Sequence, residues 1–468
     1  MNGEGRGAGK QGGLAYGLQL TAYSLLLYLL TLAPDLTQSF YSADGGELIA
    51  AAVTGGIPHP PGYPTYLLLG QLFSWLPWGM LAWRFNLLSA VGAAVGLGFT
   101  AATLRRHAPP HAVGAAVLAL AATPLLWQQA IVTEVYTLNF AVLAALLWVL
   151  EGEKPRPFWV GLLWGISLTT HLTSVFWLLV IGYSLFNAKA QRRKDAKGWA
   201  YGLRLTAYGF FLGSLPWLIL PLRAIGESPV VWGDPTTVAG WWWLVSAELY
   251  RPNVLAVPWT EIGARLMGWG TAALCQWAVV GWVLAGLGTW RILSRGEVLR
   301  GFFLFKLGLL LIYGLWVIGY AKVDSPVLLL PCLLLLSGSL AHGLASLGRA
   351  AWLLPLLLVA LHYSSIATVP VRETAVPFLN ELPPDTLLLT QGDEATFAMW
   401  YFHHAEGLRP DIIVVDSDLL AFDWYRRRLQ RHHPTLNGLA QDDLATLVQQ
   451  AERPIWHWEL LSNPEDKK

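Results

Sequence analysis

The chain has little charge and almost no cysteine. Of its 468 residues, 13% are charged and 54% are hydrophobic, and the mean hydropathy is +0.45. These values exclude an ordinary soluble protein of this length and predict a polytopic α-helical membrane protein. The two cysteines, Cys275 and Cys332, lie in apolar stretches, which excludes a disulfide framework and a cysteine metal site. A net charge of +1 gives no support for nucleic-acid binding.

Long apolar runs account for most of the sequence. Residues 1–13 read as a disordered cytoplasmic tail, and residues 14–369 as a transmembrane domain with its first outer loop at about 34–81. Lys and Arg gather in alternate loops, most densely at 187–204, which predicts a cytoplasmic N-terminus and an outward C-terminus in the cell's inner membrane. About eleven spans are expected, at 14–33, 82–104, 111–128, 135–150, 158–169, 172–186, 205–222, 266–293, 302–320, 327–347 and 350–366.

Residues 370–468 differ in character, because charge rises and no spanning run remains. Buried strands are predicted at 386–390 and 411–416 and a third strand at 454–458, with helices at 395–405 and 422–431 between them. This alternation predicts a small extracytoplasmic α/β domain with parallel strands. The turn at 392–394 follows a strand and precedes a helix, where α/β folds often bind ligands, although a simple helix cap fits it equally well.

The stretch SADGGELIAAAVTGGIPHPPGYP, residues 42–64, is not explained by membrane anchoring. If Asp44 begins a short helix, Glu47 lies on the same face, so that two carboxylates look into one space. The prolines around His59 predict a rigid bend. The apolar run 66–78 is too short to span and suits an interfacial helix. Helix capping by the two carboxylates is as probable from these residues as catalysis.

Further ionisable side chains fall in the expected outer turns, where clustering indicates a functional site. Carboxylates can act as a general base toward a hydroxyl, while cations stabilise a departing phosphate. Simpler roles are open: Glu134 could pair with Arg84, His171 could be a core histidine, and Arg223 and Lys322 could lie at helix ends with their charges in the interface. The outer-side candidates are Asp44, Glu47, His59, Arg84, Glu134, His171, Arg223, Asp234, Lys322 and Asp324.

The sequence resembles the bacterial relatives of the multispanning protein O-mannosyltransferases that modify IPT domains, in the GT-C glycosyltransferase superfamily. The resemblance begins at Asp44 with DGGELIAAAVTGGIPHPPGYPTYLLLGQLFSWLP and WRFNLLSA. Further blocks follow in the family's order: TEVYTLN (133–139), THLT (170–173), WGDP (232–235), GDEATFAMWY (392–401), RPDIIVVDSDLL (409–420) and DWY (423–425). The blocks cover most of the chain. Two positions depart from the family: Gly45 replaces a usual serine, and the turn at 322–326 lacks the expected aromatic residues.

The resemblance implies an inverting transfer of a hexose, with mannose as the first candidate, from a polyprenyl-phosphate-linked donor to a hydroxyl on a protein or cell-envelope glycan. Asp44 takes the position of the family's base, and Glu134 a second recurrent acidic position, with Glu47 as a supporting catalytic residue. No cofactor is required, although the carboxylates could hold a divalent cation. The candidate donor- or acceptor-binding residues are His59, Tyr63, Tyr136, His171, Arg223, Asp234 and Lys322.

Two other classes of function stay open. A transporter or flippase of lipid-linked sugars could use the same charges, although transporters place polar sites near the midplane in paired broken helices, and no internal repeat is visible. A receptor would use residues 370–468 to sense a ligand. In the enzyme, the apolar groove beside residues 66–78 is expected to hold the prenyl chain.

Overall fold

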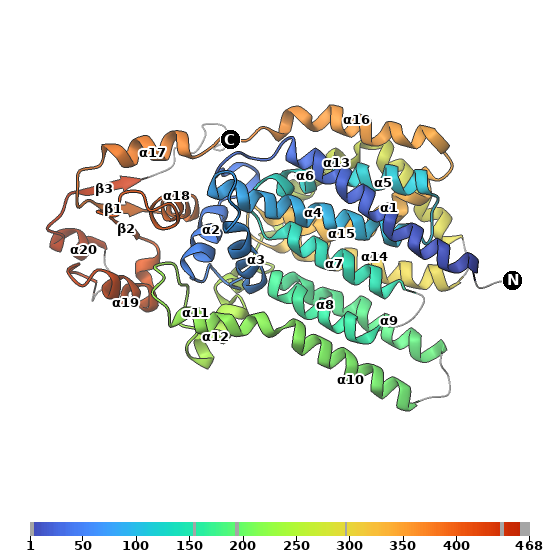
Figure 1. Cartoon of the computed structure of the whole chain (residues 1–468), viewed down its shortest axis with the longest axis horizontal. Coiled ribbons are helices and arrows are strands. Elements are labelled where there is room, and N and C mark those ends of the chain that lie inside the picture. Colours follow the sequence, from blue (N-terminus) through green and yellow to red (C-terminus); the bar gives the residue numbers. More distant parts are fainter. Residues whose placement is uncertain (1–3, 153–155, 192–195, 295–296, 440–443, 459–468) are drawn as a thin grey trace.

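The computed structural model describes residues 4–152, 156–191, 196–294, 297–439 and 444–458. Its long helices run side by side in one bundle, and the strands lie beyond one end of it (Figure 1). The helices before residue 370 are α1 (Glu4–Leu29), α2 (Gly45–Thr54), α3 (Pro64–Ser74), α4 (Leu81–Leu104), α5 (Pro110–Ala121), α6 (Pro124–Ile131), α7 (Tyr136–Leu150), α8 (Pro157–Thr170), α9 (Leu178–Gln191), α10 (Ala196–Gly213), α11 (Ile219–Ala224), α12 (Val238–Val245), α13 (Trp259–Leu293), α14 (Glu297–Gly319), α15 (Leu330–Leu344) and α16 (Leu353–His362).

Every expected span contains a helix, but fewer helices are long and apolar enough to cross a membrane unaided. In the described residues five helical segments meet that test, and a sixth is α5 with α6, which are bent by 63° at their junction. Pro124 causes this break, because proline favours the first helical turn and disfavours a helical residue before it. The chain is therefore a multi-pass helical protein, while the number of eleven spans stays a prediction.

Two expected irregular segments are helical. Helix α1 begins at Glu4, so most of the expected tail at 1–13 continues the first helix; adding a residue to an existing helix costs far less than starting one. The expected basic loop at 187–204 is largely taken up by the end of α9 and the start of α10, while residues 192–195 lie outside the described residues. The expected interfacial helix is α3, with Pro64 at its first turn and exposed apolar side chains at Leu72 and Trp75.

The last hundred residues contain the predicted parallel sheet. Strand β1 (Leu387–Thr390) lies between β2 (Ile413–Asp416) and β3 (Ile455–Trp458), and both pairings are parallel. All three strands are short. The residues of β1 and β2 are fully buried, as their continuous apolar runs predict. The helices of this region are α17 (Arg372–Glu381), α18 (Asp393–Trp400), α19 (Asp423–His432) and α20 (Leu444–Gln450).

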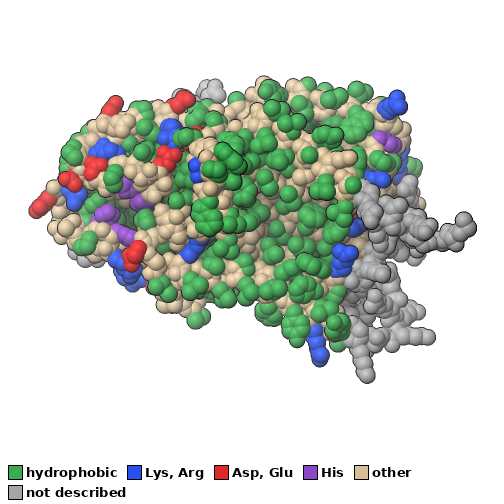
Figure 2. All heavy atoms as spheres, in the orientation of Figure 1, with side chains coloured by type: hydrophobic (Ala, Val, Ile, Leu, Met, Phe, Trp, Pro, Cys, Tyr) green, Lys and Arg blue, Asp and Glu red, His purple; other side chains and the backbone are tan. Residues whose placement is uncertain are grey.

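The hydrophobic core is divided at the boundary between the bundle and the first outer loop. One cluster lies among the long helices, and a second joins α2 and α3 to the strands and to α18. The region after residue 370 therefore shares its core with the first outer loop. Figure 2 shows a mainly hydrophobic face over the bundle, with charged side chains gathered toward its two ends. This distribution is the one expected for a protein that crosses a membrane.

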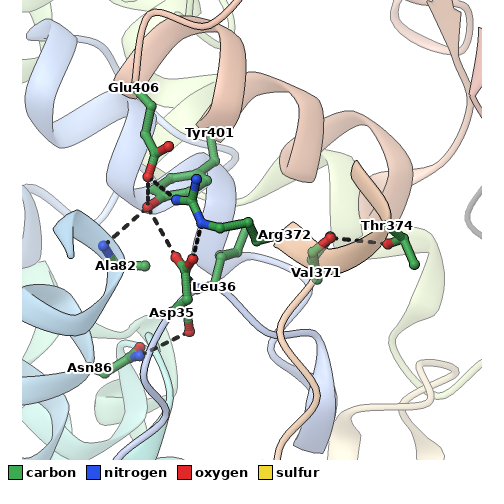
Figure 3. Close-up of polar contacts among 9 residues, drawn as sticks. All are labelled: Asp35, Leu36, Ala82, Asn86, Val371, Arg372, Thr374, Tyr401 and Glu406. Carbon is green, nitrogen blue, oxygen red and sulfur yellow. Dashed lines mark hydrogen bonds and ion pairs between the residues drawn. The ribbon is translucent and has the colours of Figure 1, made fainter. Parts of the chain in front are cut away.

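A buried polar cluster also joins the two parts (Figure 3). The guanidinium of Arg372 in α17 bonds both the Asp35 carboxylate, from the first outer loop, and the Glu406 carboxylate. The hydroxyl of Tyr401 lies 2.5 Å from Glu406 and 3.3 Å from Asp35, and it accepts a hydrogen bond from the backbone N–H of Ala82. Arg372 thus neutralises two carboxylates that would otherwise be buried side by side.

Candidate active site

A cavity of about 640 Å³ lies between the first outer loop, the end of the bundle and the region after residue 370. Its walls come from stretches that are far apart in the sequence: 41–44, 59–63, 171–173, 246–254, 316–328 and 391–395, together with Tyr136. It contains both carboxylates and cations among mainly apolar residues. A concave, largely apolar pocket with a few converging polar groups is the usual form of a small-molecule site.

His59 joins the two carboxylates of the opening motif. Its Nδ1 lies 2.5 Å from Glu47 Oε2, and its Nε2 lies 3.5 Å from Asp44 Oδ2. The backbone N–H of His59 donates a second hydrogen bond to Glu47, 3.1 Å long. The side chain of Glu47 is fully buried, whereas 27% of the Asp44 side chain is exposed, so Asp44 is the carboxylate open to the cavity.

The local geometry argues against helix capping. Asp44 stands at the N-cap of α2, but its side chain makes no capping hydrogen bond. Glu47, one turn later, points to His59 instead. His59 can reach both because the chain turns back after α2, where Gly55 is in the left-handed conformation. Asp44 and Glu47 thus point into the same space, as expected, and His59 lies between their carboxylates.

Burial and the charges of neighbouring side chains shift the pKa values of Asp44, Glu47 and His59. Burial raises the pKa of Asp44 to about 7, although the His59 cation opposes this. Burial also raises the pKa of Glu47, again opposed by His59. For His59, burial disfavours the cation, but the carboxylates of Asp44 and Glu47 outweigh it and raise the pKa to about 9. At neutral pH the histidine is therefore a cation, and Asp44 is poised between its acid and base forms.

Glu134 lies behind the cavity wall rather than in it. Its Oε2 accepts a 3.3 Å hydrogen bond from the Val135 N–H, and its Oε1 has no hydrogen-bond partner among the described residues. Burial raises its pKa well above the usual value, as does the nearby Asp44. Burial and the nearby Asp44 thus both favour the neutral form of Glu134. The alternative pairing with Arg84 is not seen, because the Arg84 guanidinium donates to carbonyls at Ser74, Trp78 and Gly79.

The expected cation Lys322 does line the cavity. Its Nζ lies 5.6 Å from the centre of the Tyr250 ring, in a cation–π contact. His171 and Tyr136 lie in the same cavity with their ring centres 5.4 Å apart, and the Tyr136 hydroxyl is 3.5 Å from Asp324. Tyr63 contributes a hydroxyl 3.1 Å from His59 Nε2. Six expected site residues therefore line one cavity: Asp44, His59, Tyr63, Tyr136, His171 and Lys322.

Two expected binding residues do not line it. The guanidinium of Arg223 donates to the carbonyls of Ala51 and Gly56, at the end of α2, where the helix dipole favours a cation. Asp234 faces Arg427 on the surface, 3.7 Å away, because the left-handed turn at Gly233 directs it away from the preceding residue. That residue, Trp232, meets the His59 ring edge-on at 6.2 Å, so the WGDP motif contributes its tryptophan to the site.

Several lining residues were not singled out from the sequence as site residues. They lie in predicted outer segments, where a charged residue neighbours an aromatic residue or follows a strand. This neighbourhood is the only sequence signal that points to them. The residues are Tyr250, Arg251, Trp316, Tyr320 and Gln391. Two residues that the sequence did point to line the same cavity: Asp324, an expected outer-side charge, and Asp393, in the expected turn at 392–394. Among the described residues, no three His, Cys, Asp or Glu side chains form a group that could hold a metal ion.

The expected prenyl groove beside residues 66–78 does not open into this cavity, since no residue of that segment lines it. Apolar residues from other segments line it instead, among them Leu172, Val254, Trp316 and Leu328. These residues come from the segment between α8 and α9, from the loop before α13, and from the region around the end of α14.

Solved structures of ArnT from Cupriavidus metallidurans are similar over most of the chain. The apo form has a TM-score of 0.37 at 16% identity, over 86% of this chain and 90% of ArnT. The form bound to undecaprenyl phosphate has a TM-score of 0.38 at 15% identity, over 94% and 90%.

Two curated proteins match much of the chain. The protein O-mannosyl-transferase TMEM260 of Mus musculus is 29% identical over 92% of this chain and 66% of its own length. Protein O-mannosyl-transferase tmem260 of Dictyostelium discoideum is 23% identical over 86% of this chain and 58% of its own length. The chain thus spans less than two thirds of the length of these relatives. They give no support to the transporter alternative.

Two family models match separate parts of the chain. Residues 44–194 match the protein O-mannosyl-transferase TMEM260 N-terminal domain, and residues 371–439 match TMEM260-associated domain 2. The first match begins at Asp44, and the second contains α18. The two matches thus include residues on both sides of the cavity, and together with the curated relatives they support the resemblance seen in the sequence: the chain is similar to the protein O-mannosyltransferases of the TMEM260 type.

Proposed function

We propose that this protein is an inverting GT-C-type glycosyltransferase that moves a hexose, mannose by analogy with its relatives' names, from a polyprenyl-phosphate-linked donor to a hydroxyl acceptor on a protein or cell-envelope glycan. The reaction takes place on the extracytoplasmic face of the cell's inner membrane. The observation that carries the proposal is a single cavity in which an open carboxylate, Asp44, shares the space with the cations of Lys322 and Arg251.

The residues have distinct roles in this reaction. Asp44 takes the proton of the acceptor hydroxyl as its oxygen attacks the anomeric carbon. The bond from that carbon to the phosphate oxygen breaks, and the electron pair leaves with the phosphate. His59, held by Glu47, sets the orientation and basicity of Asp44. Lys322 and Arg251 favour the negative charge that grows on the leaving phosphate.

Two features of the donor are assigned to the cavity. The prenyl chain lies against the apolar wall formed by Leu172, Val254 and Trp316 rather than against α3. His171, Tyr63 and Tyr136 lie near the sugar. Because phosphate is a stable leaving group, the step needs no general acid and no resident metal. Chelator treatment of the purified protein is therefore expected to leave turnover within about twofold of the untreated value.

The test is transfer of radiolabelled hexose by the purified protein from polyprenyl-phosphate donors to an envelope extract, for wild type and for Asp44→Asn. We expect transfer by the wild type and a loss of at least about a hundredfold in Asp44→Asn, the usual contribution of a general base. Donor binding by the variant should stay close to wild type, because Asp44 acts on the acceptor proton.

The matched control is Glu373→Gln, which also changes a carboxylate to an amide but on the exposed face of α17, outside the cavity. It should transfer as fast as wild type. Donor binding without transfer to any acceptor would instead favour a transporter or a receptor. Near-full turnover by Asp44→Asn would show that Asp44 is not the base.

A further inference from the structure

His171 lies between α8 and the short 3-10 helix η2 (Leu172–Trp177), and its ring caps that helix. The backbone N–H of Thr173 donates a 3.3 Å hydrogen bond to His171 Nδ1, and the Thr173 hydroxyl lies 2.8 Å from the same nitrogen. A backbone N–H can only donate, so Nδ1 is the acceptor and carries no proton. The ring proton of the neutral imidazole is therefore on Nε2.

The turn that carries His171 is held by two other helices. The Tyr313 hydroxyl, from α14, donates a 3.0 Å hydrogen bond to the carbonyl of Thr173. The side chain of Asn139, from α7, accepts a 2.9 Å hydrogen bond from the Ser174 hydroxyl. Because the backbone that caps the ring is itself fixed, the direction of the Nε2–H bond is set before any ligand binds.

The Nε2–H group of His171 is neutral and open to the cavity. Burial lowers the pKa of the His171 ring to about 4, and the nearby His59 cation lowers it further. Among the described residues none accepts a hydrogen bond from Nε2, and the side chain lines the cavity. Capping alone does not require this group, since the shorter side chains of Asn, Asp, Ser and Thr are the usual caps.

Two separate series of ring contacts lead away from His59 along the cavity wall. One passes through Tyr63, whose ring centre is 5.2 Å from that of His59, to His171, 6.3 Å farther on. The other passes through Tyr250, 6.0 Å from His59, to the ammonium of Lys322, 5.6 Å from the Tyr250 ring. A cation thus ends one series and an uncharged hydrogen-bond donor ends the other.

This difference in charge suits the two parts of a sugar phosphate. The anionic phosphate is attracted to the cation of Lys322. The hydroxyl oxygens of a hexose carry no charge, and a neutral N–H group can bind one of them without attracting the phosphate. Asp44, 3.5 Å from His59, lies where both series begin, which suits a reacting carbon between phosphate and sugar ring.

We propose that the Nε2–H group of His171 donates a hydrogen bond to a hydroxyl oxygen of the transferred sugar, with the backbone of Thr173 holding the ring in the required tautomer. The proposal rests on the transferase function proposed above. It assigns to His171 the recognition of the sugar itself, as distinct from the phosphate and the prenyl chain.

The experiment separates the two ring nitrogens of His171. In His171→Asn the amide oxygen takes the place of Nδ1 and keeps the cap, but the side chain is too short to reach the position of Nε2. In His171→Gln an amide N–H reaches that position, while the cap is lost. Binding of polyprenyl-phosphate mannose and of sugar-free polyprenyl phosphate is measured without acceptor, on the full chain in detergent, together with Tm.

His171→Asn should bind polyprenyl-phosphate mannose about fivefold more weakly than the wild type, the usual size of one hydrogen bond between neutral groups. It should bind sugar-free polyprenyl phosphate equally well and keep the wild-type Tm. His171→Gln should bind the mannose lipid within about twofold of the wild type, since it restores the donor. Its Tm should be lower, because the cap is absent.

Monodeoxy analogues of the mannose lipid identify the oxygen that His171 contacts. One analogue should bind the wild type about fivefold more weakly than the parent lipid. His171→Asn should bind that analogue and the parent equally, because the hydrogen bond is already missing. The matched control is His457→Asn, at an exposed position of β3 outside the cavity, which should bind every lipid as the wild type does.

Three results would overturn the proposal: wild-type binding of the mannose lipid by His171→Asn, equal weakening of both lipids in that variant, or a folded His171→Gln that binds no better than His171→Asn. Equal weakening would mean that the N–H group contacts the phosphate or the prenyl chain. Failure of the proposed function has a different signature, namely a wild type that shows these binding differences but transfers no sugar to any acceptor.

Discussion

At the scale of single residues, His59 determines how the two carboxylates of the opening motif differ. Glu47 is buried and bonded twice to His59, through the ring and through the backbone N–H. Asp44 meets the other ring nitrogen at 3.5 Å and keeps an open side toward the cavity. Two acids three residues apart thus have separate roles: one fixes the histidine, and the other is free to accept a proton.

The raised pKa of Asp44 predicts the pH dependence of transfer. The base form carries the reaction, and a pKa of about 7 means that this form is lost as pH falls through 7. We expect kcat/KM for the acceptor to fall about tenfold per pH unit below that value and to level off above it. Initial rates between pH 5 and 8.5 measure this, with donor saturating.

A second variant, His59→Gln, tests whether Asp44 causes the fall of kcat/KM at low pH. The His59 cation lowers the pKa of Asp44, so His59→Gln should move the acid limb to higher pH. An acid limb near pH 4 in the wild type, or one that His59→Gln does not move, would contradict the assignment.

Glu47→Gln should mainly destabilise the site. The substitution keeps the shape but replaces a charge-assisted contact with His59 by a neutral one, in a fully buried position. We expect the free energy of unfolding to fall by about 1–3 kcal/mol. Thermal unfolding and transfer rates measured on the same preparation test this, and the loss of turnover should be smaller than in Asp44→Asn. An inactive but fully stable Glu47→Gln would contradict this expectation and would show that Glu47 acts mainly on the reaction rather than on stability.

At the scale of elements, α17 and α18 are part of the membrane body's outer surface. Arg372 connects α17 to the first outer loop through Asp35, while Phe397 in α18 stacks on His59 (Figure 3 shows the first of these contacts). Contacts between residues more than 300 positions apart thus join α17 and α18 to the first outer loop. A segment that reads as a separate α/β domain in the sequence is structurally continuous with the site.

Arg372→Met should loosen this connection. The variant leaves Asp35 and Glu406 close together without a cation, and a hydrogen bond to a charged group contributes about 1.5–3 kcal/mol. Arg372 is 28% exposed, which reduces the effect, so we expect a loss of about 1–2 kcal/mol. The measurement is thermal unfolding together with the rate of proteolysis after residue 370.

The double variant Asp35→Asn with Arg372→Met provides the control. It should be less destabilised than the sum of the two single variants, because it leaves one carboxylate fewer unpaired. Additive effects would mean that the two side chains do not interact.

At the scale of the whole molecule, the charged ends and hydrophobic middle of Figure 2 agree with one insertion across a membrane. The cavity lies at the end of the bundle that carries the strands, and the N-terminal end of α1 lies at the other (Figure 1). Since basic loops face the cytoplasm, the cavity is expected to face outward.

Cysteine labelling tests this orientation simply, because the chain has only Cys275 and Cys332 to remove. In the resulting background, Glu381→Cys is predicted to react with a membrane-impermeant maleimide in intact cells, and Ala350→Cys only after the membrane is opened. Both side chains are exposed, so access alone decides the outcome. The reverse pattern would place the cavity in the cytoplasm.

The secondary-structure elements and the class of the molecule follow from the sequence alone. Apolar runs predicted the helices, continuous β-branched and leucine-rich runs predicted β1 and β2, and the motif after Asp44 located the acid that faces the cavity. These features are local, because hydrophobic period and turn chemistry are set by neighbouring residues. Family resemblance then added a function that periodicity could not supply.

Which charged residues meet depends on how the helices pack in three dimensions. Arg223 and Asp234 satisfy the same sequence criteria as Lys322, yet they bind the end of α2 and the surface while Lys322 enters the cavity. Asp393 lies almost 350 residues from Asp44, and its place in the wall depends on the packing of α18 on Gly46. Such contacts arise from long-range packing of whole helices, which no local pattern in the chain encodes.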